Sequence, residues 1–160
     1  MARIQAEWRR ERPDLDVSPQ GVIGRLHRLG AHLTGELVAV YERFGLGEGE
    51  FDVLATLRRS GAPFERAPSE LAANTMVTTG AMTKRIDRLE VAGLVARRPG
   101  GGDGRRRIVA LTPAGLALID EAFTAHIANE SRLVAALPPD DRAALERILK
   151  AWLSQVEGGA

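Results

Sequence analysis

One short hairpin constrains the fold of this chain more than any other feature. LVARR (94–98) and RRIVALT (106–112) both have the composition of strands, and PGGGDG (99–104) between them supplies the glycines of a hairpin tip. The segments on both sides of the hairpin instead have the spacing of amphipathic helices. We therefore predict a mainly α fold with a small β-hairpin wing.

Three helical segments precede the hairpin. EFDVLATLRRSG (50–61) is amphipathic, Pro68 opens the short helix PSELAANT, and TTGAMTKRIDRLEVAG (78–93) ends at a glycine. GAPFERA, between the first two, is expected to be a loop. Two helices joined by a short turn, the second with a polar outer face, form the helix-turn-helix pattern. The order helix, helix, helix, strand, strand predicts a winged helix-turn-helix lobe over residues 48–112.

Long helical segments flank this lobe within what we expect to be one domain. Ser18 and Thr112 are each followed by proline, the signal of a cap and a first helical turn, and Pro138 breaks the chain before the last helix. A lobe of about 60 residues cannot cover all the apolar stripes of these helices. Residues 1–45 and 113–157 are therefore predicted to dimerise, and a monomeric bundle over the lobe is the alternative. A two-fold homodimer would set two reading helices one DNA turn apart on a palindromic site.

Composition excludes several classes of protein. Lys and Arg (22) nearly balance Asp and Glu (21), so a cationic surface has to come from local clustering. The absence of cysteine excludes a disulfide framework and a thiolate zinc site, and three scattered histidines are a poor set of ligands, so we expect no metal and no cofactor. No nucleophile with a base and no phosphate loop is present, which argues against an enzyme. No apolar run approaches ~20 residues and no signal-peptide core is present, so we predict a cytoplasmic protein with no membrane partner.

The outer face of the 78–93 helix is the predicted DNA-reading surface. At about 100° per residue, Lys84 points nearly opposite the face formed by Met82, Ile86 and Leu89. Threonine, lysine and arginine donate hydrogen bonds to phosphates and bases, and a glycine lets the backbone come close. A solvated face with ordinary charges is the alternative. The predicted DNA-binding residues of this helix are Thr78, Thr79, Gly80, Thr83, Lys84 and Arg88.

Three successive arginines follow the hairpin tip. Arg105, Arg106 and Arg107 form a cationic finger beside the helix-turn-helix, which can enter the minor groove of double-stranded DNA. Asp103, two residues before Arg105, can orient that arginine through a bidentate pair. The alternative is a solvated run of charge. Together with the reading helix, the finger predicts DNA as a partner.

Arg85 does not fit the DNA-reading face. Its helical angle places it at the border of the buried stripe, so its guanidinium should turn toward the protein. A half-buried arginine requires an anion. Asp52 and Asp87 are the candidate structural carboxylates, and a ligand is the other possibility.

With these elements and the pattern Asp103, Arg105, Leu111, Thr112, the sequence resembles the MarR family of bacterial transcription regulators. PSELA, GAMTKRIDRLEVAGLV and LTPAG stand where that family has its equivalents, and the resemblance runs from about Ser18 to Trp152. It implies a dimeric, ligand-responsive DNA-binding protein that represses transcription from a palindromic operator. A winged helix used only for protein interactions is the alternative from another class.

The amino terminus, with WRRERPDLDVSPQGVIGRL, resembles the urate-responsive branch of this family, which carries an extra N-terminal helix. The resemblance implies a ligand site made of Trp8, Asp52, Arg85 and Arg97. For urate or a related purine anion, Trp8 would pack on the ring, the two arginines would neutralise charge, and Asp52 would accept ring N–H groups or orient an arginine. The alternatives are purely structural roles for these four residues, or an effector that is an aromatic carboxylate or an antibiotic-like phenol.

Overall fold

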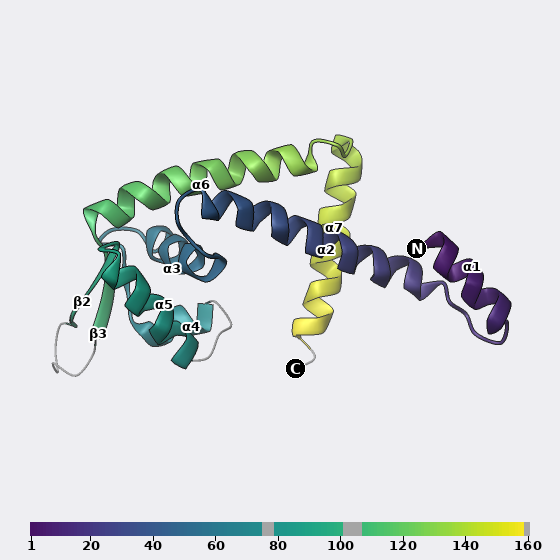
Figure 1. Ribbon diagram of the computed structural model, residues 1–160, viewed down its shortest axis with the longest axis horizontal. Helices are drawn as coiled ribbons and strands as arrows, with labels where there is room; N and C mark the ends of the chain where they lie inside the picture. The colour runs from purple at the N-terminus through teal and green to yellow at the C-terminus, as the bar shows by residue number, and fades with distance from the viewer. Residues whose placement is uncertain (75–78, 101–106, 159–160) are drawn as a thin grey trace.

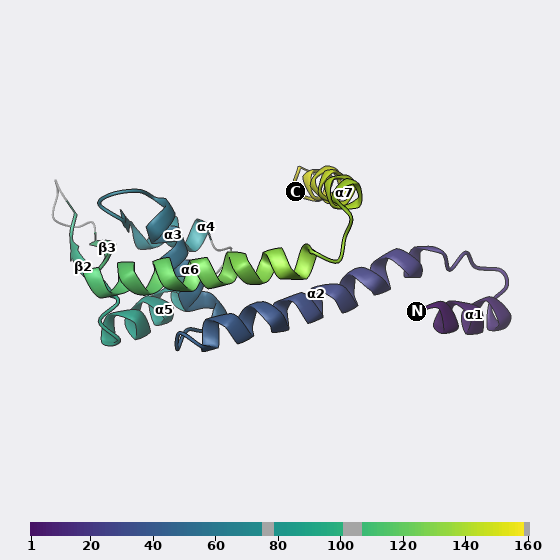
Figure 2. The same cartoon turned by 90° about the horizontal axis from the view of Figure 1, so that it is seen from above.

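The computed structural model of the protein describes residues 1–74, 79–100 and 107–158 (Figure 1). Short helices and the strands form a lobe at one end of an elongated molecule. The two longest helices run side by side away from this lobe (Figure 2). The predicted mainly α fold with a small wing is confirmed. In chain order the elements are α1 (Ala2–Glu11), α2 (Pro19–Glu42), α3 (Glu48–Arg59), β1 (Glu65–Arg66), α4 (Pro68–Asn74), α5 (Thr79–Val91), β2 (Val95–Pro99), β3 (Arg107–Leu111), α6 (Pro113–Val134) and α7 (Pro139–Glu157).

The hydrophobic core lies in the lobe and in the adjoining parts of α2 and α6. Leu54 and Leu57 of α3 have no exposed surface, and the inner face predicted for α5 is buried at Met82, Ile86 and Leu89, each 1% exposed. Fully burying a leucine-sized side chain contributes about 1.5–3 kcal/mol, so these two helices supply much of the energy that holds the lobe together. The polar side of α5 is left facing outward.

The sheet of the lobe has three antiparallel strands in the order β1-β3-β2. In the wing, Arg97 of β2 lies opposite Val109 of β3, and Pro99 lies opposite Arg107. The expectation of a plain loop at GAPFERA is wrong, because Glu65 and Arg66 pair with β3. Two residues are too few to show the alternation of side chains by which a strand is recognised in a sequence.

The two predicted helix caps differ in outcome. Thr112 caps α6 as expected, since its hydroxyl accepts a hydrogen bond from the Gly115 amide at 3.0 Å. Ser18 stands at the N-cap of α2 and Pro19 at its first position, as predicted, but the Ser18 side chain makes no cap bond. Asp16 instead accepts bonds from both the amide of Ser18 (2.9 Å) and its hydroxyl (2.8 Å). A carboxylate two residues earlier in the chain is a stronger acceptor than a hydroxyl, and it takes up that hydroxyl as well.

At the end remote from the lobe, α1 folds back against the start of α2. Gln5 is only 8% exposed, and its side-chain amide donates to the carbonyl of Val17 at 3.1 Å. A Cβ atom at Gly24 would overlap the side chain of Met1, and one at Gly21 would press on Gln5, so two glycines one helical turn apart provide a flat seat for α1. These contacts fix the position of α1 on its own chain.

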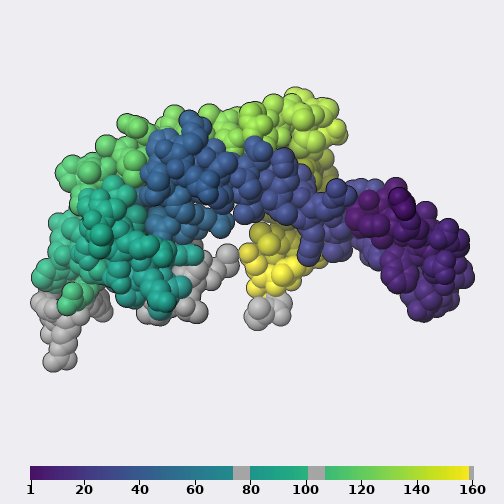
Figure 3. Space-filling view, in the orientation of Figure 1, coloured from purple at the N-terminus to yellow at the C-terminus, as the bar shows by residue number. Residues whose placement is uncertain are grey.

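The terminal helices expose much of their apolar surface. No residue of α7 is buried, and α7 lies across α2 so that apolar side chains of both line a cavity of about 790 Å³. The space-filling view shows α7 and α1 standing clear of the lobe (Figure 3). No helix among the described residues combines the length and the apolarity needed to cross a membrane. The large exposed apolar residues of the terminal helices include Ile4, Trp8, Val22, Ile23, Leu29, Phe123, Ile127, Leu145, Ile148, Leu149, Trp152, Leu153 and Val156.

Candidate nucleic-acid interface and ligand site

The predicted reading face of α5 is open to solvent. Gly80, Thr83 and Lys84 are exposed, and space around Gly80 is free of other atoms within 4 Å of a notional Cβ. α5 begins at Thr79, while Thr78 lies outside the described residues. The helix therefore presents a cation and an approachable stretch of backbone on the side opposite the core, as a DNA-reading surface requires.

Arg88 reaches back from α5 to α3. Its Nε donates to Glu50 Oε1 at 2.7 Å, and Glu50 Oε2 also accepts a bond from the Gly47 amide at 3.1 Å. One carboxylate thus caps α3 and holds the recognition helix. The Arg88 side chain remains 64% exposed, so its positive charge is still accessible to solvent beside the reading face.

The stem of the wing carries more positive charge than the sequence prediction assigned to it. Arg107 is exposed at the first position of β3, whereas Asp103, Arg105 and Arg106 lie outside the described residues, so their predicted roles stay predictions. Arg98, which we did not single out from the sequence, is 53% exposed and pairs with Glu65 at 3.3 Å. Its place at the end of a strand beside the arginine run was the available signal. Together Arg97, Arg98, Pro99 and Arg107 line a polar hollow of about 210 Å³.

Arg85 turns toward the protein, as its helical angle predicted. Its guanidinium occupies the space beside Gly49 of α3 where any Cβ would overlap it. Asp52 lies one turn further along α3, and the charge of Arg85 acts on it directly. Burial raises the pKa of Asp52 above its ordinary range, Glu48 raises it further, and Arg85 opposes both. α3 and α5 therefore meet at a site with a carboxylate and a guanidinium.

An aromatic cluster beneath this site joins the lobe to the long helices. Tyr41 of α2 stacks on Phe51 of α3 at 4.0 Å between ring centroids, and its hydroxyl lies 3.2 Å from Nδ1 of His126 on α6. The other ring nitrogen of His126 lies 3.3 Å from Glu130. Burial raises the pKa of Tyr41 to about 12, and the negative charge of Asp52 adds to the shift. The sequence offered no signal for this contact, because its three elements are far apart along the chain.

Arg97 does not face Asp52. Its guanidinium forms ion pairs with Asp87 and Glu90, both on α5. The backbone amide of Arg97 bonds to Glu90 at 3.1 Å, and this bond, followed by the guanidinium, lowers the pKa of that carboxyl. Asp87 was one of two candidate partners for Arg85, and the structure pairs it with Arg97 instead. Arg97 thus ties β2 to the recognition helix.

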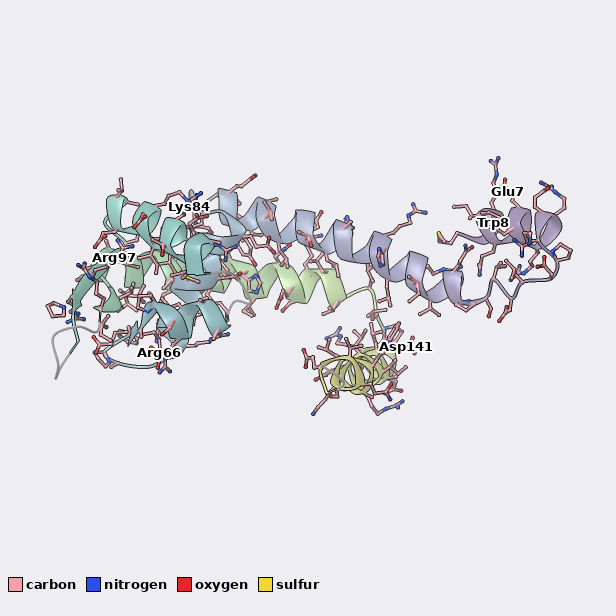
Figure 4. The ribbon with its side chains drawn as sticks, turned by 90° about the horizontal axis from the view of Figure 1, so that it is seen from below. Glu7, Trp8, Arg66, Lys84, Arg97 and Asp141 are labelled. Carbon is pink, nitrogen blue, oxygen red and sulfur yellow. The ribbon has the colours of Figure 1, made fainter. Side chains whose placement is uncertain are left out.

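Trp8 is far from the other three predicted ligand residues within one chain. It is 46% exposed on α1, and Figure 4 places it and Arg97 at opposite ends of the molecule. The 24 residues of α2 separate α1 from the lobe, which is a distance of about 36 Å at about 1.5 Å per residue. One chain therefore brings Asp52 and Arg85 together, with Arg97 bound on the other side of α5 and Trp8 remote. Among the described residues, no cluster of His, Asp and Glu could hold a metal ion.

Comparison with known proteins places this arrangement in a family. The model of the MarR family matches residues 44–106. The HTH-type transcriptional regulator PecS of Dickeya dadantii is 40% identical over 146 residues, which cover 91% of this chain and 88% of PecS. The chain belongs to the MarR family. It is accordingly a transcriptional regulator with a DNA-binding winged helix, and its relatives are regulators rather than enzymes.

Solved structures of MarR-family proteins share the whole architecture. AbsC from Streptomyces coelicolor is 26% identical, with a TM-score of 0.80 over 90% of this chain and 97% of that one. A mutant MarR from E. coli complexed with operator DNA is 29% identical, with a TM-score of 0.72 over 87% and 99% of the two chains. The similarity extends beyond the lobe into the long helices.

Proposed function

We propose that this MarR-family protein acts in the cytoplasm as a homodimeric repressor that binds a palindromic operator and is released by urate or a related purine anion. The observation that carries the ligand response is the position of Arg85. It belongs to the recognition helix α5, yet its guanidinium lies against Gly49 of α3, beside Asp52. A ligand that binds this guanidinium can therefore shift the position of the helix that reads DNA.

Operator binding is supported by the surfaces of the lobe. Lys84 is exposed on α5, and the hollow formed by Arg98 and Arg107 on the wing stem adds a second cationic feature on the same lobe. Contacts with phosphates position such a protein on the duplex, while the reading helix selects bases. Two lobes held by a two-fold axis would meet successive major grooves.

Release by a ligand requires two conformations of different affinity. An anion that binds Arg85 more tightly in one arrangement of α3 and α5 than in the other shifts the population toward the first. Asp52 suits a purine, because a carboxylate beside a guanidinium can accept hydrogen bonds from ring N–H groups. A dimer bound across an operator would block transcription until this shift occurs.

Isothermal titration calorimetry with urate, run beside salicylate, tests the effector. We expect saturable urate binding that Arg85→Ala abolishes, because the variant removes the guanidinium beside Asp52. Heat from salicylate alone would assign the response to an aromatic carboxylate, and heat from neither ligand would reject this effector class.

Lys84→Ala is the matched control, because Lys84 precedes Arg85 on α5 but faces away from the protein. We expect Lys84→Ala to bind urate normally and to weaken DNA binding across sequences, with the salt slope of binding reduced by about 1 for one lost phosphate contact. Arg85→Ala should instead lose urate binding and keep most of its affinity for DNA. Equal loss of DNA affinity in both variants would reject the assignment of separate faces.

A further inference from the structure

Two successive arginines of β2 lie on opposite faces of the wing. Arg97 is paired with Val109, which has no exposed surface, and residues directly opposite one another in antiparallel strands share a face of the sheet. Arg98, the next residue, lies on the other face, where it pairs with Glu65 of β1. The Arg97 side chain is only 19% exposed. It is therefore placed to connect the inner face of the wing to α5.

Two carboxylates of α5 hold Arg97 at once. Asp87 and Glu90 are three residues apart, so they lie on the same side of the helix. Glu90 accepts a bond from the Arg97 backbone amide at 3.1 Å and also pairs with its guanidinium, while Asp87 pairs with the other terminal nitrogen. Hydrogen bonds between charged groups are short and strong. These bonds fix both the strand and the direction of its side chain against α5.

The Arg97 ion pairs lie at a distance from the turn that joins α5 to β2. The chain turns at Gly93, with φ +72°, and the Thr112 hydroxyl donates to the Gly93 carbonyl at 2.7 Å. Arg97 stands three residues beyond Leu94, which is about 10 Å at about 3.3 Å per residue. Bonds at the turn alone would leave the strand free to pivot there. A second attachment along the strand sets the direction in which the wing projects from α5.

Negative charge on a DNA-binding helix opposes its function. The Asp87 and Glu90 side chains are 54% and 38% exposed, on the helix that also carries the exposed Lys84. Figure 4 shows Lys84 and Arg97 on the same lobe. Carboxylates near a duplex repel its phosphates, so by charge alone these two residues weaken binding. Their bonds to Arg97 give them a structural use, and the same bonds engage the guanidinium within the protein.

We propose that Arg97 is a positioning residue for DNA binding, which holds the wing against the recognition helix through Asp87 and Glu90 without contacting DNA itself. The wing and α5 then meet the duplex as one surface of fixed shape. The inference rests on the DNA-binding role of the winged helix. It depends neither on the effector nor on the symmetry of the dimer.

Removal of the two carboxylates tests the proposal by the direction of its effect. The probe is a duplex that the unaltered protein selects from a random-sequence pool, and fluorescence anisotropy measures binding. Charge alone predicts that Asp87→Ala/Glu90→Ala tightens binding, because two negative charges are lost. We expect binding about tenfold weaker instead, as the loss of charged hydrogen bonds that position the wing implies. Equal or tighter binding would overturn the proposal.

The matched control removes the same charge elsewhere. Glu42→Ala/Glu121→Ala alters exposed positions of α2 and α6. It should leave DNA binding unchanged or slightly tighter. A loss as large as that of the α5 variant would show that the effect comes from overall charge, and the positioning role would be rejected.

A mutant cycle distinguishes positioning from contact with DNA. Arg97→Ala should weaken binding by the same factor as Asp87→Ala/Glu90→Ala, and the triple variant should lose no more, because both changes break one set of bonds. Independent roles would instead multiply to a loss of about a hundredfold in the triple variant. That outcome would mean that Arg97 acts without its two partners.

Hydrogen exchange tests the same bonds in the protein without DNA. In Asp87→Ala/Glu90→Ala, the amides of β2 and β3 should exchange faster, while those of α3 near the buried Leu54 and Leu57 keep their rates. Unchanged exchange in the wing would show that the carboxylates do not hold it. Faster exchange throughout the lobe would show a general loss of stability and would equally reject a positioning role.

Discussion

The winged lobe and the terminal helices differ sharply in how completely one chain buries their apolar side chains. In the lobe, Leu54 and Leu57 have no exposed surface, whereas Leu149 and Trp152 of α7 are 40% and 38% exposed. The lobe has a finished core within the chain. The terminal helices present their apolar stripes to the surroundings, and this difference separates the residues that fold the lobe from the residues that we propose to assemble the dimer.

The largest expected effect comes from placing a charge on the uncovered face. Leu149 lines both apolar cavities between α2 and α7. In a dimer that buries this face, Leu149→Glu would leave a carboxylate without a partner, a cost on the order of 4 kcal/mol, or a roughly thousandfold weaker dimer. Analytical ultracentrifugation should show monomers, and operator binding should weaken because the dimer is lost. Near-native circular dichroism would show that the lobe still folds.

Lys150→Glu is the control for this variant, because it reverses a charge at the next position, on the polar side of α7. It should leave the dimer intact. A Leu149→Glu protein that stays dimeric at low concentration would show that the exposed stripe of α7 is not the assembly surface.

The complementary change removes packing inside the lobe. Leu54→Ala deletes a fully buried side chain and should lower the free energy of unfolding by about 3 kcal/mol, as expected for leucine truncation in a core. Urea denaturation followed by circular dichroism measures the loss. Val91→Ala, at a position 91% exposed, should change the same quantity by less than about 0.5 kcal/mol. Similar losses in both variants would mean that the lobe core is not the source of stability.

Local signals were sufficient to predict most of the fold. Gly93, with φ +72°, ends the recognition helix where the sequence placed its stop, and Thr112 caps α6. The period of apolar residues gave the inner faces of α3 and α5. Two details differ from the prediction: Asp16, a neighbouring carboxylate, takes the Ser18 hydroxyl that would have made the cap bond, and β1 forms by pairing with a strand far along the chain.

The candidate site was predictable only in part. The helical angle of Arg85 showed that it turns inward, since that depends on one helix alone. Its seat at Gly49 and the capture of Arg97 by Asp87 and Glu90 depend on how separate elements pack, which no spacing in the sequence records. The remoteness of Trp8 likewise appears only once the 24 residues of α2 are seen to hold α1 away from the lobe (Figure 4).

A smaller effect is expected where the lobe positions Arg85. Gly49→Ala places a methyl group in the space of the Arg85 guanidinium, which has to move away because it is the flexible partner. Helix propensity favours alanine by up to about 1 kcal/mol, so the protein should keep or gain stability, while the urate response that we propose should fall as in Arg85→Ala. Since Arg85 lowers the pKa of Asp52, an NMR titration should find that pKa raised further.

Gly35→Ala is the control for Gly49→Ala. It makes the same gain in helix propensity without displacing a side chain, because a Cβ at Gly35 meets nothing within 4 Å. It should gain similar stability and keep the full response. An unchanged response and an unchanged Asp52 titration in Gly49→Ala would show that the seat of Arg85 has no part in ligand recognition.

The smallest effect concerns the joint between the two regions, where Tyr41 of α2 meets Phe51 of the lobe and His126 of α6. Tyr41 is the only tyrosine, so its ionisation can be followed by absorbance alone. We expect a pKa of about 12, raised by burial and then by Asp52. A tyrosine that keeps its proton in the folded state contributes stability that is lost as pH rises from its ordinary pKa of 10 toward 12. Asp52→Asn should bring the titration closer to 10 at little cost at neutral pH. Titration at 10 in the unaltered protein would mean that the Tyr41 ring does not join the lobe to the long helices. Movement of the lobe would then not be transmitted to the long helices through this contact.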